Sequence, residues 1–320
     1  MDIIGFILWP IKWVIEAILV GFHSLLTAAG MEAAAGITWV LSITGLVLVI
    51  RAALIPVFVR QIKSQRRMME IAPQLKKIQD KYKGKRDQFS REAMSRETMA
   101  LYKNTGTNPL SSCLPLLLQM PIFFGLFSVL NDAYATPARP SVGLLTPQLQ
   151  QQFGEASLFG VAPLGSSMAT SDGNITVIVI AVILVILMTG SQFITQLQIM
   201  SKNQSPEMKA SPMYRQQRIL LYVLPLVFAF SGFAFPLGVM FYWFVSNIWT
   251  MVQQFIVIRN MPTPGSEAAL AREARLAKRR QRKGLPTIVE DAPAAVVEEP
   301  KKTQRVQPVG KNRAKKKGGK

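Results

Sequence analysis

Long apolar stretches without a single charge alternate along the chain with short, strongly charged segments. No Asp, Glu, Lys or Arg stands within residues 104–131, 175–201 or 219–258. As a helix, each stretch can cross the roughly 30 Å hydrocarbon layer of a bilayer. A helix also satisfies its backbone hydrogen bonds within its own segment, as lipid requires. The pattern therefore predicts an all-α integral membrane protein.

Five transmembrane helices fit this pattern. The uncharged residues 219–258 are too many for one crossing, and Ser231, Gly232 and Pro236 offer a turn near their middle. We therefore expect a helical hairpin there, with a short fourth helix. The expected spans are residues 37–59, 113–131, 175–199, 219–233 and 235–259.

The N-terminal segment, residues 1–36, is hydrophobic but carries Lys12 and Glu16. These two residues are one helical turn apart and share a face. Trp9 and Trp13 suit the headgroup level of a membrane. We expect an amphipathic helix that lies in the membrane interface, and a signal segment or an extra span is the alternative.

Basic residues are concentrated in three of the connecting segments. Residues 60–103, 202–218 and 261–320 carry net charges of +8, +3 and +10, whereas residues 1–36 and 131–173 each carry −2. Because Lys and Arg favour the cytoplasmic side, we expect the three basic segments to face the cytoplasm. The C-terminus is then cytoplasmic.

The connections differ in pattern as well as in charge. Residues 60–112 keep apolar positions at helical intervals, and Gly84 between two lysines interrupts them. This pattern predicts a cytoplasmic helical hairpin that turns near Gly84. Residues 132–174 are expected to form an extracytoplasmic loop and residues 200–218 a cytoplasmic one.

The composition excludes several classes of protein. A chain of 320 residues that is 49% hydrophobic and 17% charged, with a mean hydropathy of +0.24, is too apolar for a soluble globule. The single Cys113 cannot form an intrachain disulfide, and with the single His23 it argues against a zinc site. Motifs of hydrolases, metalloproteases and P-loop enzymes are absent from the sequence. We expect no enzyme activity, no metal and no cofactor.

The basic tail, residues 260–320, is expected to be largely disordered except for a basic helix over 267–283. Such a tail can bind anionic lipids by charge. It can equally bind ribosomal RNA, because neutralising phosphates releases counterions. Composition leaves both partners open. The residues expected to make these contacts are Arg272, Arg275, Arg279, Arg280, Arg282, Lys283, Lys315, Lys316 and Lys317.

One cation stands inside a predicted span. Arg51 is the only charged residue between Glu32 and Arg60, and it lies about 13 Å of helix rise from Arg60. An arginine at the centre of a membrane helix costs about 2.5–3.5 kcal/mol on insertion scales. It could snorkel to the headgroups, but apolar residues separate it from the cytoplasmic end. A water-filled cavity inside the helix bundle is the preferred interpretation.

Other spans supply uncharged polar residues that could line the same cavity. Thr189, Gln192 and Gln196 repeat at intervals of three and four, which places them on one helical face. Hydrogen bonding between helices is the alternative role for such residues. No Asp or Glu in these spans could neutralise Arg51, so the cavity should attract acidic or hydrogen-bonding segments of another polypeptide. The expected lining residues are Arg51, Gln119, Gln192, Gln196, Tyr242, Ser246 and Asn247.

Three blocks of the sequence resemble the YidC-type membrane protein insertases, in the short form found in Gram-positive bacteria. The resemblance covers about residues 39–259, starting with the arginine-bearing span that holds Ser42, Arg51 and Pro56. The further motifs are Met68-Met69-Glu70-Ile71-Ala72-Pro73, Leu101-Tyr102-Lys103, Asn108-Pro109-Leu110, Cys113-Leu114-Pro115, Gln119-Met120-Pro121-Ile122-Phe123, Phe235-Pro236-Leu237-Gly238, Tyr242-Trp243, Ser246-Asn247 and Gln253-Gln254.

The resemblance implies an insertase and chaperone in the bacterial plasma membrane. Arg51, Gln119, Gln192 and Trp243 would line a hydrophilic groove that draws in the polar part of a nascent membrane protein. The implied partners are nascent membrane proteins, the Sec translocon, the ribosome through the basic tail, and anionic lipids. Two other functions stay open from the residues alone. One is a small-solute transporter or channel, although the sequence shows neither a coupling carboxylate in a span nor two similar halves. The other is a membrane anchor that tethers ribosomes.

Overall fold

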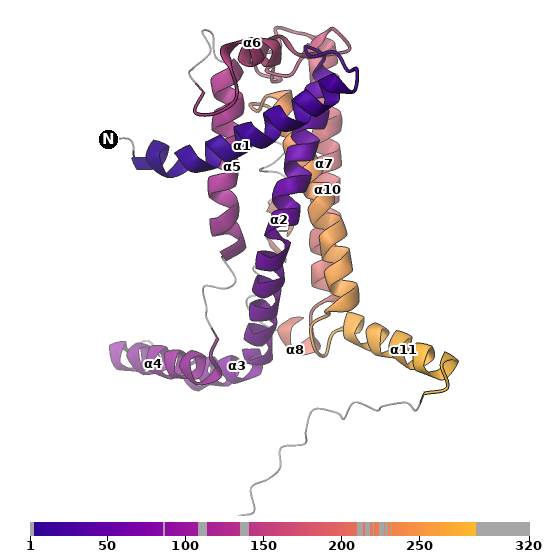
Figure 1. Ribbon diagram of the computed structural model, residues 1–320. Helices are drawn as coiled ribbons and strands as arrows, with labels where there is room; N and C mark the ends of the chain where they lie inside the picture. The colour runs from indigo at the N-terminus through magenta and orange to yellow at the C-terminus, as the bar shows by residue number, and fades with distance from the viewer. Residues whose placement is uncertain are drawn as a thin grey trace, which may run out of the picture. The chain divides into compact units, whose positions relative to one another are not determined.

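The computed structural model describes residues 3–85, 87–107, 114–134, 141–209 and 232–285, together with a few residues between 214 and 230. It divides into two compact units, residues 1–273 and 274–320. The described part is mostly helical, as the sequence predicts (Figure 1). Its elements are α1 Ile3–Ala28, α2 Gly36–Glu70, α3 Ala72–Lys81, α4 Gln88–Thr105, α5 Leu114–Tyr134, α6 Pro147–Glu155, β1 Ser157–Leu158, β2 Ala162–Pro163, α7 Ile175–Lys202, α8 Pro206–Lys209, α10 Leu237–Asn260 and α11 Glu267–Arg282.

Three helices in the described part are long and apolar enough to cross a membrane, namely Leu8–Ala28, Gly36–Met68 and Ile175–Lys202. The last two correspond to the first and third predicted spans. Helices α5 and α10 occupy the second and fifth predicted spans, whereas the fourth, residues 219–233, lies partly outside the described residues. The count of five spans therefore stays a prediction.

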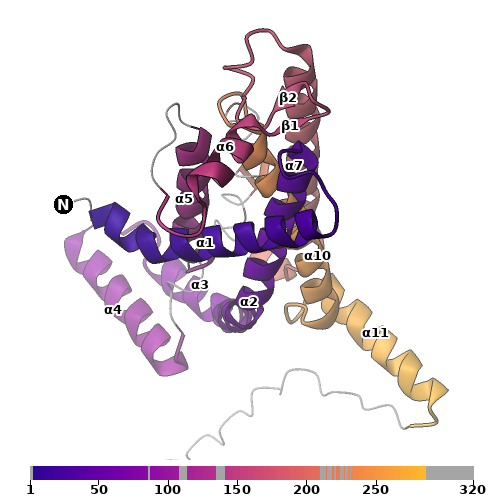
Figure 2. The same ribbon diagram turned by 45° about the horizontal axis from the view of Figure 1, so that its top comes forward.

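Helix α1 meets the length and composition of a span, but its direction differs from that of the other long helices in its unit. It packs on α2 and α5 and crosses them steeply (Figures 1 and 2). Ile15 and Leu19 are fully buried against these helices, while Trp9 and Trp13 stay exposed. Whether α1 lies in the membrane interface or spans the membrane stays a prediction.

The two charges of α1 hold it to the rest of the unit. The Lys12 ammonium donates to the Asp132 carboxylate over 2.9 Å and to Ser128 over 3.0 Å, both on α5. The buried Glu16 carboxylate accepts hydrogen bonds from the backbone N–H groups of Val142, at 3.2 Å, and Gly143, at 2.7 Å. Both charges therefore have partners within the protein.

Helix α2 extends beyond the predicted span of residues 37–59. It continues to Glu70, so the first part of the predicted hairpin is a continuation of α2. The break comes at Ile71, because Pro73 in the first turn of α3 cannot donate a backbone hydrogen bond and suits a helix start. The pattern is helical both before and after residue 59, so it did not show that the span and the segment after it form one helix. The hairpin itself consists only of α3 and α4.

The turn between α3 and α4 falls where the sequence predicts it. Gly84 has a φ of +84°, which glycine adopts without strain. Asp87 then caps α4 by accepting the Ser90 N–H at 2.8 Å, and this bond lowers the pKa of the Asp87 carboxyl. Glu97 joins the two helices by accepting from the Lys81 ammonium at 2.5 Å and from the Tyr82 hydroxyl at 2.8 Å.

Residues 141–174 contain more regular structure than the loop that the sequence predicts. They contain α6 and a two-stranded antiparallel sheet in which Ser157 pairs with Pro163 and Leu158 with Ala162. Strands of two residues are too short to produce an alternating pattern, so they could not be predicted from periodicity. Phe153 on α6 packs against Trp39 of α2 at a centroid distance of 4.7 Å, which joins this region to the core.

A glycine permits the close approach of this sheet to α2. At Gly36, a Cβ atom would lie 2.5 Å from the backbone carbon and oxygen of Ser157. At Gly21 on α1, by contrast, a Cβ would meet nothing within 4 Å. The two glycines form a matched pair for a test of this packing.

We predict that Gly36→Ala destabilises the protein by about 1–3 kcal/mol, the usual cost of overpacking a close contact. Gly21→Ala should be neutral or slightly stabilising, because alanine favours a helix. Thermal unfolding of both variants in detergent measures the difference. Equal unfolding temperatures for the two variants would show that α2 and Ser157 are not in contact.

Candidate functional site

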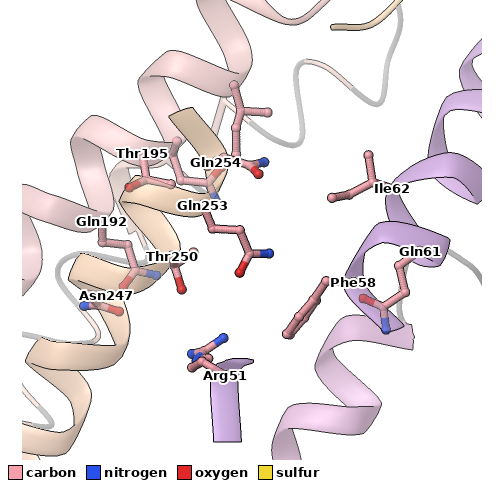
Figure 3. A pocket seen from close by; sticks show the side chains of 12 residues that line it. Arg51, Phe58, Gln61, Ile62, Gln192, Thr195, Asn247, Thr250, Gln253 and Gln254 are labelled. Carbon is pink, nitrogen blue, oxygen red and sulfur yellow. The ribbon is translucent and has the colours of Figure 1, made fainter. Parts of the chain in front are cut away.

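A polar pocket lies between α2, α7 and α10 and contains Arg51 (Figure 3). Its cavity volume is about 250 Å³. On each helix the lining residues recur at intervals of three and four, so that each helix presents one face to the pocket. Those residues are Arg51, Phe58, Gln61 and Ile62 of α2, Gln192, Thr195, Gln196 and Ile199 of α7, and Asn247, Thr250, Gln253 and Gln254 of α10.

Arg51 is the only charged residue among those that line the pocket in the described structure. Its guanidinium group lies 6.0 Å from the centre of the Phe58 ring, close enough for a cation–π attraction. The lining therefore combines one positive charge with amide and hydroxyl groups, which can both donate and accept hydrogen bonds. Such a surface suits an acidic or polar ligand that brings its own hydrogen-bonding groups.

A second set of expected residues closes the pocket beside Arg51. Gln119 of α5 donates a hydrogen bond to the Tyr242 hydroxyl of α10 over 3.2 Å. Tyr242 and Ser246 are buried, and both line a narrow space that also contains Arg51 and Gln119. These residues therefore lie beside Arg51 at the closed end of the pocket.

Gln61 is a polar residue of the pocket that the sequence did not single out. Its side chain is 4% exposed, and neither its amide nitrogen nor its amide oxygen has a hydrogen-bond partner within the described structure. A buried amide without a partner costs roughly 1–3 kcal/mol, so Gln61 can gain energy from a bound polar group. The sequence placed Gln61 in the hairpin, because the span was expected to end at residue 59.

The structure places Trp243 away from the pocket. Its ring lies 5.4 Å from that of Phe123 and 5.5 Å from that of Phe235, within an aromatic cluster of the core. Trp243 follows Tyr242 directly, so it points to a different face of α10. Trp243 is therefore not among the residues that line this pocket, and its role toward a client stays a prediction.

The structure brings the remaining expected residues together around Arg51. Gln192, Gln196 and Asn247 line the polar pocket, and Gln119, Tyr242 and Ser246 lie at its closed end. The sequence did not single out the neighbouring polar residues on the same faces of α7 and α10. Continuing the interval of three or four from Gln192 and Asn247 would have found Thr195, Thr250 and Gln254.

The expected tail residues fall partly within the second unit. Helix α11 ends at Arg282, close to the predicted end at residue 283, and none of its residues is buried. It includes Arg272, Arg275, Arg279 and Arg280, and Lys283 follows it. Lys315, Lys316 and Lys317 lie outside the described residues, so their contacts stay a prediction.

Comparisons with known proteins agree on one family. Residues 30–264 match the family model described as 60Kd inner membrane protein. The Membrane protein insertase YidC of Tropheryma whipplei (strain Twist) is 44% identical over 98% of this chain and 97% of its own length. That of Bifidobacterium longum is 35% identical over 97% of this chain and 95% of its own length. That of Streptomyces avermitilis is 44% identical over 87% of this chain and 63% of its own length.

We predict that the polar pocket admits water and small polar reagents. In a background with Cys113→Ser, cysteines at Gln196 and at Asn247 should react readily with a membrane-impermeant maleimide. A cysteine at Trp243 should react at least tenfold more slowly, because that position lies in the aromatic cluster. Labelling rates followed by mass spectrometry check this. Equal rates at all three positions would contradict the pocket.

Proposed function

We propose that this chain, which belongs to the 60Kd inner membrane protein family, inserts its clients through the polar pocket around Arg51. The matched relatives are YidC membrane protein insertases, and on that similarity the chain is a bacterial membrane protein and an insertase. The family is not a family of enzymes. Membership also decides against the solute transporter and the simple ribosome anchor.

The single observation that carries the mechanism is an arginine in a polar pocket without a carboxylate among its lining residues. The positive charge attracts an acidic or polar segment of the client into the bundle. The amides and hydroxyls around it replace part of the water that this segment loses. The client's polar segment then has to cross only the remaining apolar layer rather than a full bilayer, and the membrane potential can assist acidic segments.

The orientation in the membrane follows from the charged segments. The positive-inside rule places α3, α4 and the basic tail in the cytoplasm, and it places α6 and the small sheet outside. The five spans are α2, α5, α7, residues 219–233 and α10, with α1 in the outer interface. In this orientation Gln119, Tyr242 and Ser246, at the closed end of the pocket, lie between the pocket and the outside.

The partners follow from the same charges. The clients are nascent membrane proteins, which the insertase also helps to fold, alone or with the Sec translocon. The basic residues of α11 and of the tail bind the ribosome through its RNA and hold anionic lipids. Helix α11 supports this role, because it presents its arginines without burying a residue.

We predict that Arg51→Ala slows insertion of a single-span client with an acidic translocated tail by about tenfold or more. The reason is the lost attraction between the guanidinium group and the acidic tail, since a charged hydrogen bond contributes about 1.5–3 kcal/mol. Liposomes that contain the purified protein, followed by protease protection of the tail, measure this effect.

The matched control is Arg60→Ala, which removes an exposed cation of the same helix without touching the pocket. It should insert the client at nearly the rate of the unchanged protein. If both variants insert normally, the pocket cation has no part in insertion. If both fail equally while folded, the effect comes from the general positive charge of the protein.

A further inference from the structure

The turn between β1 and β2 places a phenylalanine where such a turn favours a small residue. The Val161 N–H donates to the Leu158 carbonyl over 3.1 Å, and the two residues between them, Phe159 and Gly160, have φ values of +55° and +73°. A turn with positive φ at both central positions favours Asn, Asp or Gly there. A bulky side chain at such a position is strained. The backbone of this turn therefore gives no reason for a phenylalanine.

Packing gives no reason for Phe159 either. Its side chain is 87% exposed, whereas the preceding Leu158 is buried in the core. Val161, on the other side of the turn, is 51% exposed. The described part of the protein therefore leaves both apolar side chains of the turn uncovered. A strained residue without a packing role points to a function outside the fold.

The turn is fixed to the beginning of α7. The Asn174 side-chain amide donates to the Val161 carbonyl over 2.7 Å. The side-chain oxygen of Asn174 accepts from the backbone N–H groups of Thr176, at 3.0 Å, and Val177, at 3.3 Å. One side chain thus joins the turn to the N-terminal end of the helix. Figure 2 shows the two strands close to α7, and β2 packs against this helix.

The exposed apolar face of α7 begins at the same level as the turn. Ile175, Val179, Ile183 and Ile186 are exposed and recur at intervals of three and four along this helix. In a helix that crosses a bilayer, such a face lies against lipid. Helix α7 has 28 residues and rises about 42 Å, which matches a bilayer with its headgroups. With its C-terminal end at the cytoplasmic surface, the turn lies at the outer surface.

The segment that contains the turn carries no charge. No Asp, Glu, Lys or Arg occurs between Glu155 and Asp172. An uncharged apolar tip can enter the boundary between headgroups and acyl chains, whereas a charged tip would have to lose its hydration. The exposed side chains of the turn also continue the apolar face of α7. Lipid that surrounds the start of α7 is therefore the occupant that best fits the turn.

We propose that the turn of residues 158–161 inserts into the outer leaflet, where Phe159 and Val161 contact lipid acyl chains just below the headgroups. Asn174 transmits this contact to α7, and the pairing of β1 with β2 transmits it to the small sheet. The turn then fixes the depth of the outer end of the bundle in the membrane. The proposal rests on the orientation given under the proposed function, which places this sheet outside.

The test replaces Phe159 in the full chain by the photoreactive amino acid p-benzoylphenylalanine, which keeps an aromatic ring at this position. The matched control carries it at Gln148, which is exposed on α6. Both proteins are irradiated in bacterial membranes, and mass spectrometry identifies what is attached. We expect phospholipid on position 159, at a yield at least fivefold above that at position 148.

Three outcomes would overturn the proposal. If position 159 attaches to another protein and to no lipid, the turn is a docking surface for that protein. If it attaches to nothing, the ring lies in water. If positions 148 and 159 attach to lipid equally, the turn has no special contact with the bilayer.

A separate measurement tests the orientation on which the proposal rests. In a Cys113→Ser background, Gln148→Cys should react with a membrane-impermeant maleimide added outside intact cells. If it reacts only after the membrane is opened, the proposed orientation and the lipid contact fail together. If it reacts from outside while position 159 attaches to no lipid, the lipid contact alone fails.

The contribution of the ring is measured at its neighbour. Val161→Cys in the Cys113→Ser background carries a fluorescent probe, and vesicles of phosphatidylethanolamine and phosphatidylglycerol contain a lipid with a nitroxide near the headgroup end of its acyl chain. Phe159→Asn should reduce quenching of the probe at least twofold, although Asn suits the backbone of the turn. Phe159→Trp, which keeps a large apolar ring, should preserve the quenching. Equal quenching in the two variants contradicts the proposal.

Discussion

A cation inside a membrane helix must be kept away from hydrocarbon, and the arrangement around Arg51 meets that constraint. The cost of leaving an arginine in lipid is several kcal/mol, a large part of the stability of a protein. Here α7 and α10 turn their amide and hydroxyl side chains toward the same space as Arg51. A carboxylate in this lining would neutralise the charge and leave nothing to attract a client, so the uncharged polar lining is essential to the proposed mechanism.

The rest of the first unit closes one end of this space. Gln119 and Tyr242 bond to each other beside Arg51, and aromatic packing around Phe153 and Trp39 fills the region beyond them. The ion pair of Lys12 with Asp132 fixes α1 across α2 and α5. A pocket that is closed at one end can hold a polar segment without opening a continuous aqueous path across the membrane.

The sequence predicted the helical class and part of the pocket lining, namely Arg51, Gln192, Gln196 and Asn247, because a charge inside a span and polar residues spaced by three or four are strong local signals. It failed for Gln61, whose side chain enters the pocket only because α2 continues past residue 59. It failed for the two short strands, which depend on contacts with α2 rather than on local pattern. The packing of Trp243 against Phe123 and Phe235 could not be predicted, because a motif fixes the order of residues but not the face of the helix.

The central claim is that insertion needs a positive charge in the polar pocket, and not Arg51 as such. The most direct measurement moves the charge to the facing helix, by combining Arg51→Ala with Gln192→Arg. The rate at which this double variant inserts an acidic client is compared with the rate for Arg51→Ala alone. Both variants must show the same thermal unfolding. The account predicts that the double variant recovers most of the lost rate. A double variant that inserts no better than the single one would contradict it.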